Sequence, residues 1–182
     1  MGHALLTKLL LPTLLRTAEQ PNADVRVVAL SSIGHIGAPP SGILFERLKT
    51  SMNSYTTWTM VRYGQSKLAN ILFIKELARR YPRITAVAVH PGIVNTDLYR
   101  TTVGWPVVGR VAAWVRDWAF TEVEEGARGT LWAVGEGLDE VKSGEYYTPV
   151  GVPGQGSRLS EDMELARKLW EWTEKELEGW EL

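Results

Sequence analysis

The sequence predicts an α/β domain built around a parallel sheet. Residues 25–30 (VRVVAL) and 84–89 (ITAVAV) are short, continuous apolar runs of the kind found in buried strands. Between them, residues 63–80 repeat apolar side chains at close to helical spacing, and Pro82 follows where such a helix would stop. A strand, a helix and a second strand in this order form a right-handed βαβ unit, in which the two strands are parallel.

The segment before this unit is predicted to form an amphipathic helix over residues 3–17. Pro12 either introduces a kink in this helix or starts a new turn. A targeting segment is not expected, because no basic stretch opens it and Lys8 interrupts its apolar run. The run is also too short to span a bilayer. We therefore expect a cytoplasmic protein without an integral membrane segment.

The segment after the unit predicts two further helices and a third strand. Thr121 and Glu124 have the spacing of a capping box that opens a helix. Residues 144–148 predict a third parallel strand, and Ser160 is the expected N-cap of a C-terminal helix. The residues expected on the apolar face of that helix are Met163, Ala166, Leu169, Trp170, Thr173 and Leu177.

The composition excludes several classes of function. The 182 residues include 20 basic and 21 acidic side chains, so charge does not favour nucleic acid or an anionic membrane as a partner. Without cysteine there is no disulfide and no thiol chemistry. The three histidines lack the spacing of a metal site, and the sequence reveals no partner for His35 or His90. We expect one domain, residues 1–182, without a bound metal.

Tyr63 and Lys67 lie four positions apart, on the same side of the predicted helix. One interpretation is ordinary packing beside a surface lysine. The other is proton transfer, because a phenol titrates near pKa ~10 and a fixed ammonium group favours its phenolate form. The spacing alone is weak evidence, since such pairs also arise by chance.

Further polar residues follow the predicted strands. Ser31 and Ser32 come directly after the first strand, and residues 90–92 (HPG) come directly after the second. The carboxyl ends of parallel strands meet at one rim, where open α/β sheets bind their ligands. Tyr63, expected at the start of its helix, reaches this rim if residues 33–62 fold back.

In this order, the motifs resemble the short-chain dehydrogenase/reductase family along nearly the whole chain. The matching segments are GHALLTKLLLP, the strand ending in Ser-Ser, YGQSK as a Tyr-x-x-x-Lys motif, and HPGIVNTDL as the Pro-Gly segment beside the nicotinamide. The segment SKLANILFIKELARR is similar to the retinol-dehydrogenase-like branch. The resemblance implies a Rossmann-like sheet and hydride transfer, with NADP or NAD as cofactor, to or from an apolar carbonyl or alcohol.

The resemblance also implies a role for each matching residue. Tyr63 corresponds to the general acid/base, Lys67 to the residue that favours its phenolate and holds the nicotinamide ribose, and Ser32 to the donor that polarises the carbonyl. The residues that match the carboxamide-binding stretch are Pro91, Gly92, Val94 and Thr96. Residues 98–120, rich in tryptophan, match the substrate lid and indicate an apolar substrate.

Each of these residues also has a purely structural interpretation. Ser32 suits a turn at the end of a strand, Thr96 suits a helical cap, and Gly92 suits a tight turn. The tryptophans of residues 98–120 are more often packed in a core or lid than in contact with a ligand.

The chain resembles only the C-terminal half of the family. The strand, Gly-rich turn and helix that bind the pyrophosphate would precede Gly2, and the Gly-rich stretches at 32–37 and 150–156 do not open a helix as that turn must. Two functions stay open: an NAD(P)-dependent oxidoreductase, and a non-catalytic remnant that binds a protein partner through its helices. Residues 3–17 and 63–80 resemble the family's dimer interface, so we expect a homo-oligomer.

Overall fold

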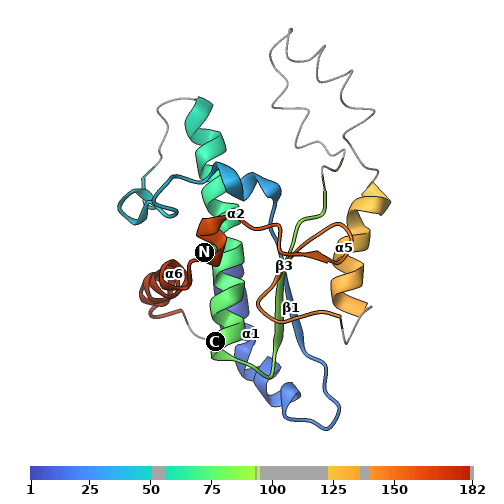
Figure 1. Cartoon of the computed structure of the whole chain (residues 1–182). Coiled ribbons are helices and arrows are strands. Elements are labelled where there is room, and N and C mark those ends of the chain that lie inside the picture. Colours follow the sequence, from blue (N-terminus) through green and yellow to red (C-terminus); the bar gives the residue numbers. More distant parts are fainter. Residues whose placement is uncertain (51–55, 93, 95–122, 136–139, 181–182) are drawn as a thin grey trace.

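The structure, a computed structural model, describes residues 1–50, 56–92, 94, 123–135 and 140–180. Its sheet has the strand order β1-β2-β3-β4 (Figure 1). β1 (Arg26–Leu30), β2 (Thr85–Val89) and β3 (Tyr146–Thr148) are parallel, which confirms the predicted α/β parallel sheet. β4 (Val152–Pro153) runs antiparallel to β3. It was not predicted, because two residues are too few to show an alternating pattern.

Helices cover both faces of this sheet. α2 (Thr56–Arg80) packs on one face and α5 (Val123–Gly135) on the other (Figure 1). β2 lies between them, and four of its five residues are buried, which explains its continuous apolar run. The buried residues on the α2 side include Ile71, Ile74, Leu77, Ala86 and Ala88, and those on the α5 side include Val87, Val89, Trp132 and Tyr147. The predicted capping residue Thr121 lies outside the described residues.

α2 begins at Thr56 rather than at Tyr63, so the prediction that Tyr63 opens the helix was wrong. The segment 59–62 is exposed or half-buried and therefore shows no amphipathic pattern. It also contains neither glycine nor proline, so nothing in it stops the helix from extending. Tyr63 consequently lies about two turns inside α2 rather than at its first residue.

α1 (Gly2–Ala18) is one helix that contains Pro12. None of its residues is fully buried, and the side chains of Leu6 and Leu10 are exposed. α1 is therefore covered less completely by the rest of the described chain than α2 is.

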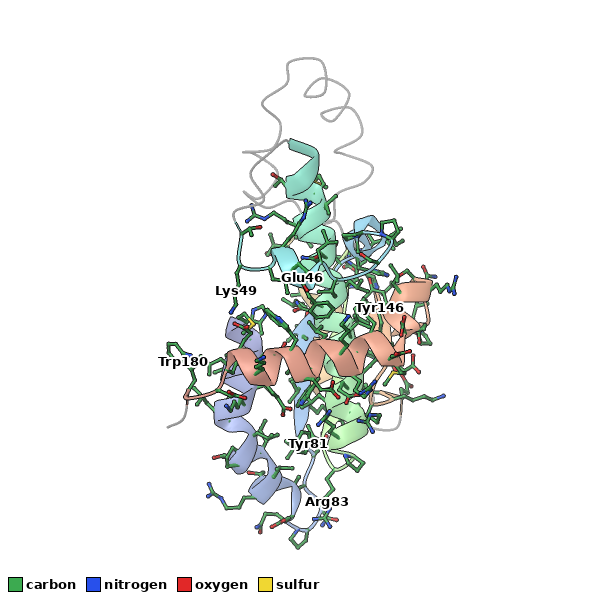
Figure 2. All side chains as sticks on the ribbon, turned by 90° about the vertical axis from the view of Figure 1, so that its left-hand side faces the viewer. Glu46, Lys49, Tyr81, Arg83, Tyr146 and Trp180 are labelled. Atoms are coloured by element: carbon green, nitrogen blue, oxygen red, sulfur yellow. The ribbon has the colours of Figure 1, made fainter. Side chains whose placement is uncertain are left out.

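α6 (Met163–Glu176) crosses α2 on the side away from the sheet (Figure 2). Its N-cap is Asp162, whose carboxylate accepts a hydrogen bond from an N–H of the first turn at 2.9 Å. The prediction of Ser160 as N-cap was wrong, because Ser160 is buried in the short helix η3 (Arg158–Glu161) that precedes α6. The side chains buried by α6 are Ala166, Leu169, Trp170 and Thr173, whereas Met163 is exposed.

A buried carboxylate near the C-terminal end of α2 is paired with two arginines of the same helix. Glu76 is fully buried and accepts hydrogen bonds from Arg79 at 2.7 and 2.8 Å and from Arg80 at 2.7 Å. The hydrogen bond from Arg79, with the second arginine and both positive charges, holds the pKa of Glu76 below its usual value. The Arg80 guanidinium also lies 5.0 Å from the ring centroid of Trp170 in α6. The two arginines thus satisfy the buried charge within α2, and Arg80 also joins α2 to α6.

Candidate functional site

The end of β1 places two serines in different environments. Ser31 continues the sheet, because its N–H donates to the Val89 carbonyl at 2.8 Å, and its hydroxyl donates to the Lys67 carbonyl at 2.7 Å. Ser32 is the N-cap of the short helix η1 (Ile33–Gly37), and its Oγ accepts the Gly34 N–H at 3.1 Å. Because Ser32 Oγ accepts in that bond, its hydroxyl proton is left to donate to another group.

Two glycines let the Ser32 turn approach Tyr63. A Cβ at Gly34 would lie 2.6 Å from Cε1 of the Tyr63 ring and 3.4 Å from Ser32 Oγ, so the ring and the hydroxyl converge on one point. A Cβ at Gly64 would lie 2.6 Å from the carbonyl carbon of Gly37, so the backbones of α2 and η1 are in direct contact. A side chain at either position would separate Ser32 from Tyr63.

Lys67 completes the group. Its Nζ lies 5.7 Å from the centroid of the Tyr63 ring and donates to the Leu30 carbonyl at 3.3 Å. The same carbonyl accepts a hydrogen bond from Asn70 Nδ2 at 2.9 Å. Burial lowers the pKa of the Lys67 ammonium group from its usual value. Asn70 was not predicted as part of this group, although its position one helical turn after Lys67 places it on the same side of α2.

The segment after β2 forms the neighbouring part of the rim. Gly92 has a φ of +88°, a backbone conformation that glycine adopts at little cost. Val94 packs directly on Gly126 of α5, with its Cγ1 3.1 Å from the place that a Cβ of Gly126 would occupy. Pro91 is half-buried beside them. Thr96 and residues 98–120 lie outside the described residues.

Two buried polar side chains near the rim had no role in the sequence analysis. In the described part of the chain, His90 Nδ1 and the Tyr146 hydroxyl are buried without a hydrogen-bond partner. Burial, together with the neighbouring His35, lowers the pKa of His90. Burial, together with Tyr63, raises the pKa of Tyr146 to about 12. Residues 88 and 146 are paired in register, so His90 and Tyr146 lie on the same face of the sheet as α2.

The group as a whole is suited to proton transfer. A phenol, a hydroxyl with a free proton and an ammonium group lie together at the carboxyl ends of β1 and β2. The phenol can exchange a proton, the ammonium group places a positive charge beside the phenol ring, and the hydroxyl can donate to an oxygen that gains negative charge.

Known proteins with similar sequences are oxidoreductases. No family model matches the chain. Short-chain dehydrogenase/reductase drtF of Aspergillus calidoustus is 36% identical over 195 aligned residues, which cover 100% of this chain and 60% of that protein. Human retinol dehydrogenase 13 is 35% identical, with 93% of this chain and 49% of that protein covered. Short-chain dehydrogenase TIC 32 A, chloroplastic, of Brassica napus is 33% identical, with 98% of this chain and 55% of that protein covered.

Solved structures show the same fold. An uncharacterized protein from Mycobacterium paratuberculosis superimposes with a TM-score of 0.57 at 29% identity, with 84% of this chain and 50% of that chain covered. A short-chain dehydrogenase/reductase from Saccharomyces cerevisiae superimposes with a TM-score of 0.50 at 22% identity, with 87% of this chain and 54% of that chain covered. This similarity supports the fold alone.

The parallel sheet with helices on both faces defines an α/β protein. The chain is homologous along its whole length to short-chain dehydrogenases/reductases and belongs to that family. It spans about half the length of the curated relatives that it matches. None of the helices in the described ranges has the length and apolar character needed to cross a membrane.

Proposed function

We propose that the chain contributes to NAD(P)-dependent hydride transfer to or from an apolar carbonyl or alcohol. The observation that carries the proposal is the convergence of Tyr63 and Ser32 on Gly34, with the Lys67 ammonium group 5.7 Å from the centroid of the Tyr63 ring. In this proposal Ser32, Tyr63 and Lys67 are the catalytic residues. The retinol dehydrogenase among the relatives supports an apolar substrate.

Each catalytic residue has one task. The Ser32 hydroxyl donates to the substrate oxygen, since Oγ is already oriented by the Gly34 N–H. The Tyr63 hydroxyl gives a proton to that oxygen in reduction and takes it back in oxidation. The Lys67 ammonium group places a positive charge beside the Tyr63 ring and is held at the rim by its hydrogen bond to the Leu30 carbonyl.

The rim has the chemistry needed for the nicotinamide end of the cofactor. Lys67 donates one hydrogen bond, to the Leu30 carbonyl, among the described residues, and its remaining N–H groups can donate to ribose hydroxyls. Gly92 has no side chain, so its backbone is accessible to a ligand. The residues that would hold this end are Tyr63, Lys67, Pro91, Gly92, Val94 and Thr96. When bound, NADPH or NADH would supply the hydride for reduction, and NADP or NAD would accept it in oxidation. In the described residues no Gly-rich turn joins a strand to an α-helix, so no residues of this chain are proposed to bind the pyrophosphate of the cofactor.

Substitution of Tyr63 tests the proposal. With NADPH or NADH and a panel of apolar aldehydes and ketones, Tyr63→Phe is expected to lower kcat by about 10²–10⁴-fold, the usual contribution of a general acid/base. The control is Tyr81→Phe, at the other end of α2, which is expected to keep the parental kcat. Turnover that persists in Tyr63→Phe would remove Tyr63 from the reaction.

A second candidate function is a helix-mediated protein–protein interface without catalysis. The exposed Leu6 and Leu10 of α1 favour it, because they form an apolar surface that the described chain does not cover. The same surface supports a homo-oligomer through residues 3–17 and 63–80, although α6 already covers part of α2. If this interface is the function, Leu6→Glu reduces the particle size in light scattering, whereas Tyr63→Phe has no effect on any measured activity.

Two further expectations belong with this proposal. We propose that residues 1–182 form a single domain, the C-terminal portion of an NAD(P)-binding fold, which the coverage of the relatives supports. A cytoplasmic location also stays a prediction, since one relative is named as chloroplastic.

A further inference from the structure

His35 is a buried residue whose two ring nitrogens are both hydrogen-bonded. Its side chain is 1% exposed. Nδ1 lies 2.8 Å from the Ser32 carbonyl oxygen, and Nε2 lies 3.1 Å from the Ser157 backbone N–H. The edge of the ring also contacts Tyr146, with the ring centroids 5.2 Å apart.

These contacts allow one form of the imidazole. A backbone N–H can only donate, so Nε2 must accept from Ser157 and carries no proton. The proton of the neutral ring is therefore on Nδ1, where it donates to the Ser32 carbonyl. If the proton moved to Nε2, it would face the Ser157 N–H, and Nδ1 would face a carbonyl oxygen without a proton between them.

The two partners come from distant parts of the chain. Ser32 is the N-cap of η1, and Ser157 is the N-cap of η3, 122 positions away in sequence from His35. Ser157 is itself held on the η3 side, because its carbonyl accepts from the Ser160 hydroxyl at 2.7 Å and its Oγ accepts from the Ser160 N–H at 3.3 Å. The direction of the Ser157 N–H is thus set by η3.

We infer that His35 is a positioning residue for Ser32, and that the Ser157 N–H selects the tautomer in which His35 can act. The Ser32 carbonyl accepts both the His35 backbone N–H at 3.0 Å and the Nδ1 proton at 2.8 Å, and the second bond strengthens the hold on the peptide plane that follows Ser32 and on the direction of its side chain. The segment before η3 thereby controls the proposed carbonyl donor through one imidazole. This inference rests on the proposed function of Ser32.

NMR of the His35 ring nitrogens tests the tautomer without an activity assay. At a pH at which free imidazole is neutral, the parent protein is expected to show the proton on Nδ1. Ser157→Pro removes the N–H, and its φ of −88° is close to the range of proline, so this variant is expected to show a mixture of tautomers. Ser157→Ala loses the cap but keeps the N–H, and it is expected to match the parent. A proton on Nε2 in the parent, or an unchanged ring in Ser157→Pro, overturns the inference.

Two substitutions of His35 separate positioning from packing. In His35→Asn the side-chain amide replaces Nδ1 as donor to Ser32, so kcat is expected to stay within about threefold of the parent. In His35→Gln the amide oxygen replaces Nε2 as acceptor from Ser157, the side-chain bond to Ser32 is lost while the backbone bond remains, and kcat is expected to fall by about 10- to 100-fold. Equal losses in both variants, as a packing defect would cause, contradict the inference.

A double variant provides the remaining control. An asparagine amide has no tautomers, so its donor to Ser32 does not depend on the Ser157 N–H. Ser157→Pro is therefore expected to lower kcat in the parent but not in His35→Asn. A further loss of kcat in the double variant contradicts control through His35. Ser32→Ala and Tyr63→Phe, in the same assay, report on the proposed function. If neither lowers turnover, that function and the catalytic part of this inference both fail, whereas the NMR result still decides whether Ser157 sets the tautomer.

Discussion

Replacement of Gly64 by alanine tests whether the contact between α2 and η1 is as close as the structure shows. A Cβ at residue 64 would lie 2.6 Å from the carbonyl carbon of Gly37, 2.8 Å from the Ala38 nitrogen and 2.8 Å from the Gly34 oxygen. All three are backbone atoms, so no side-chain rotation relieves the overlap. η1 must move away from α2, and Ser32 moves with it.

The expected change in the free energy of unfolding has two parts of opposite sign. Alanine stabilises a helix interior by about 1 kcal/mol relative to glycine. Overpacking of a well-packed contact costs about 1–3 kcal/mol, and three backbone neighbours favour the upper end of that range. We therefore expect Gly64→Ala to destabilise the protein by about 2 kcal/mol.

Gly129→Ala in α5 is the matched control. Its Cβ would lie 3.5 Å from Val89 Cγ1, an ordinary van der Waals distance, so the gain in helix propensity of up to about 1 kcal/mol is expected without a clash. The midpoint and slope of urea unfolding give both free energies. If Gly64→Ala unfolds at the same urea concentration as Gly129→Ala or a higher one, the backbone contact is looser than described and the positions of Ser32 and Tyr63 are not coupled through it.

Two further predictions concern buried polar groups near the rim. Tyr147 Oη accepts the Lys142 N–H at 2.8 Å, so Tyr147→Phe is expected to lower the free energy of unfolding in urea by about 1–3 kcal/mol. The Tyr146 hydroxyl has no partner among the described residues, so Tyr146→Phe is expected to lower this free energy by less than about 0.5 kcal/mol or to raise it. Equal costs would show that the Tyr146 hydroxyl is hydrogen-bonded. Because burial lowers the pKa of His90, the unfolded chain binds a proton first as the pH falls below about 6.5, and stability is lost from there down to the folded-state pKa. Between pH 8 and pH 5, the free energy of unfolding in urea is expected to fall less in His90→Asn than in the parent. An identical dependence of this free energy on pH in both proteins would exclude His90 as the cause.

The parallel sheet could be predicted from the order of strands and helix, and the helical period places Tyr63 and Lys67 on one side of α2. The approach of Ser32 to Tyr63 was expected from the family resemblance and depended on how residues 33–62 fold. The start of α2 was missed for a physical reason: residues 59–62 are exposed or half-buried and show no apolar pattern. The contacts of His35 could not be found either, since one partner lies 122 positions away and forms its bond with a backbone N–H that any residue except proline supplies.

The contact between the C-terminal end of α2 and α6 gives α2 the geometry of a lever. The Arg80 guanidinium over the Trp170 ring holds this end of the helix, and Tyr63 lies 13 residues before Glu76, which corresponds to about 20 Å along the helix axis. At that radius, a tilt of about 3° about this end moves the Tyr63 ring by about 1 Å, a displacement large enough to change a rate by about 10²-fold. A substitution at the far end of α2 can therefore change the alignment of the phenol with Ser32 without touching either residue.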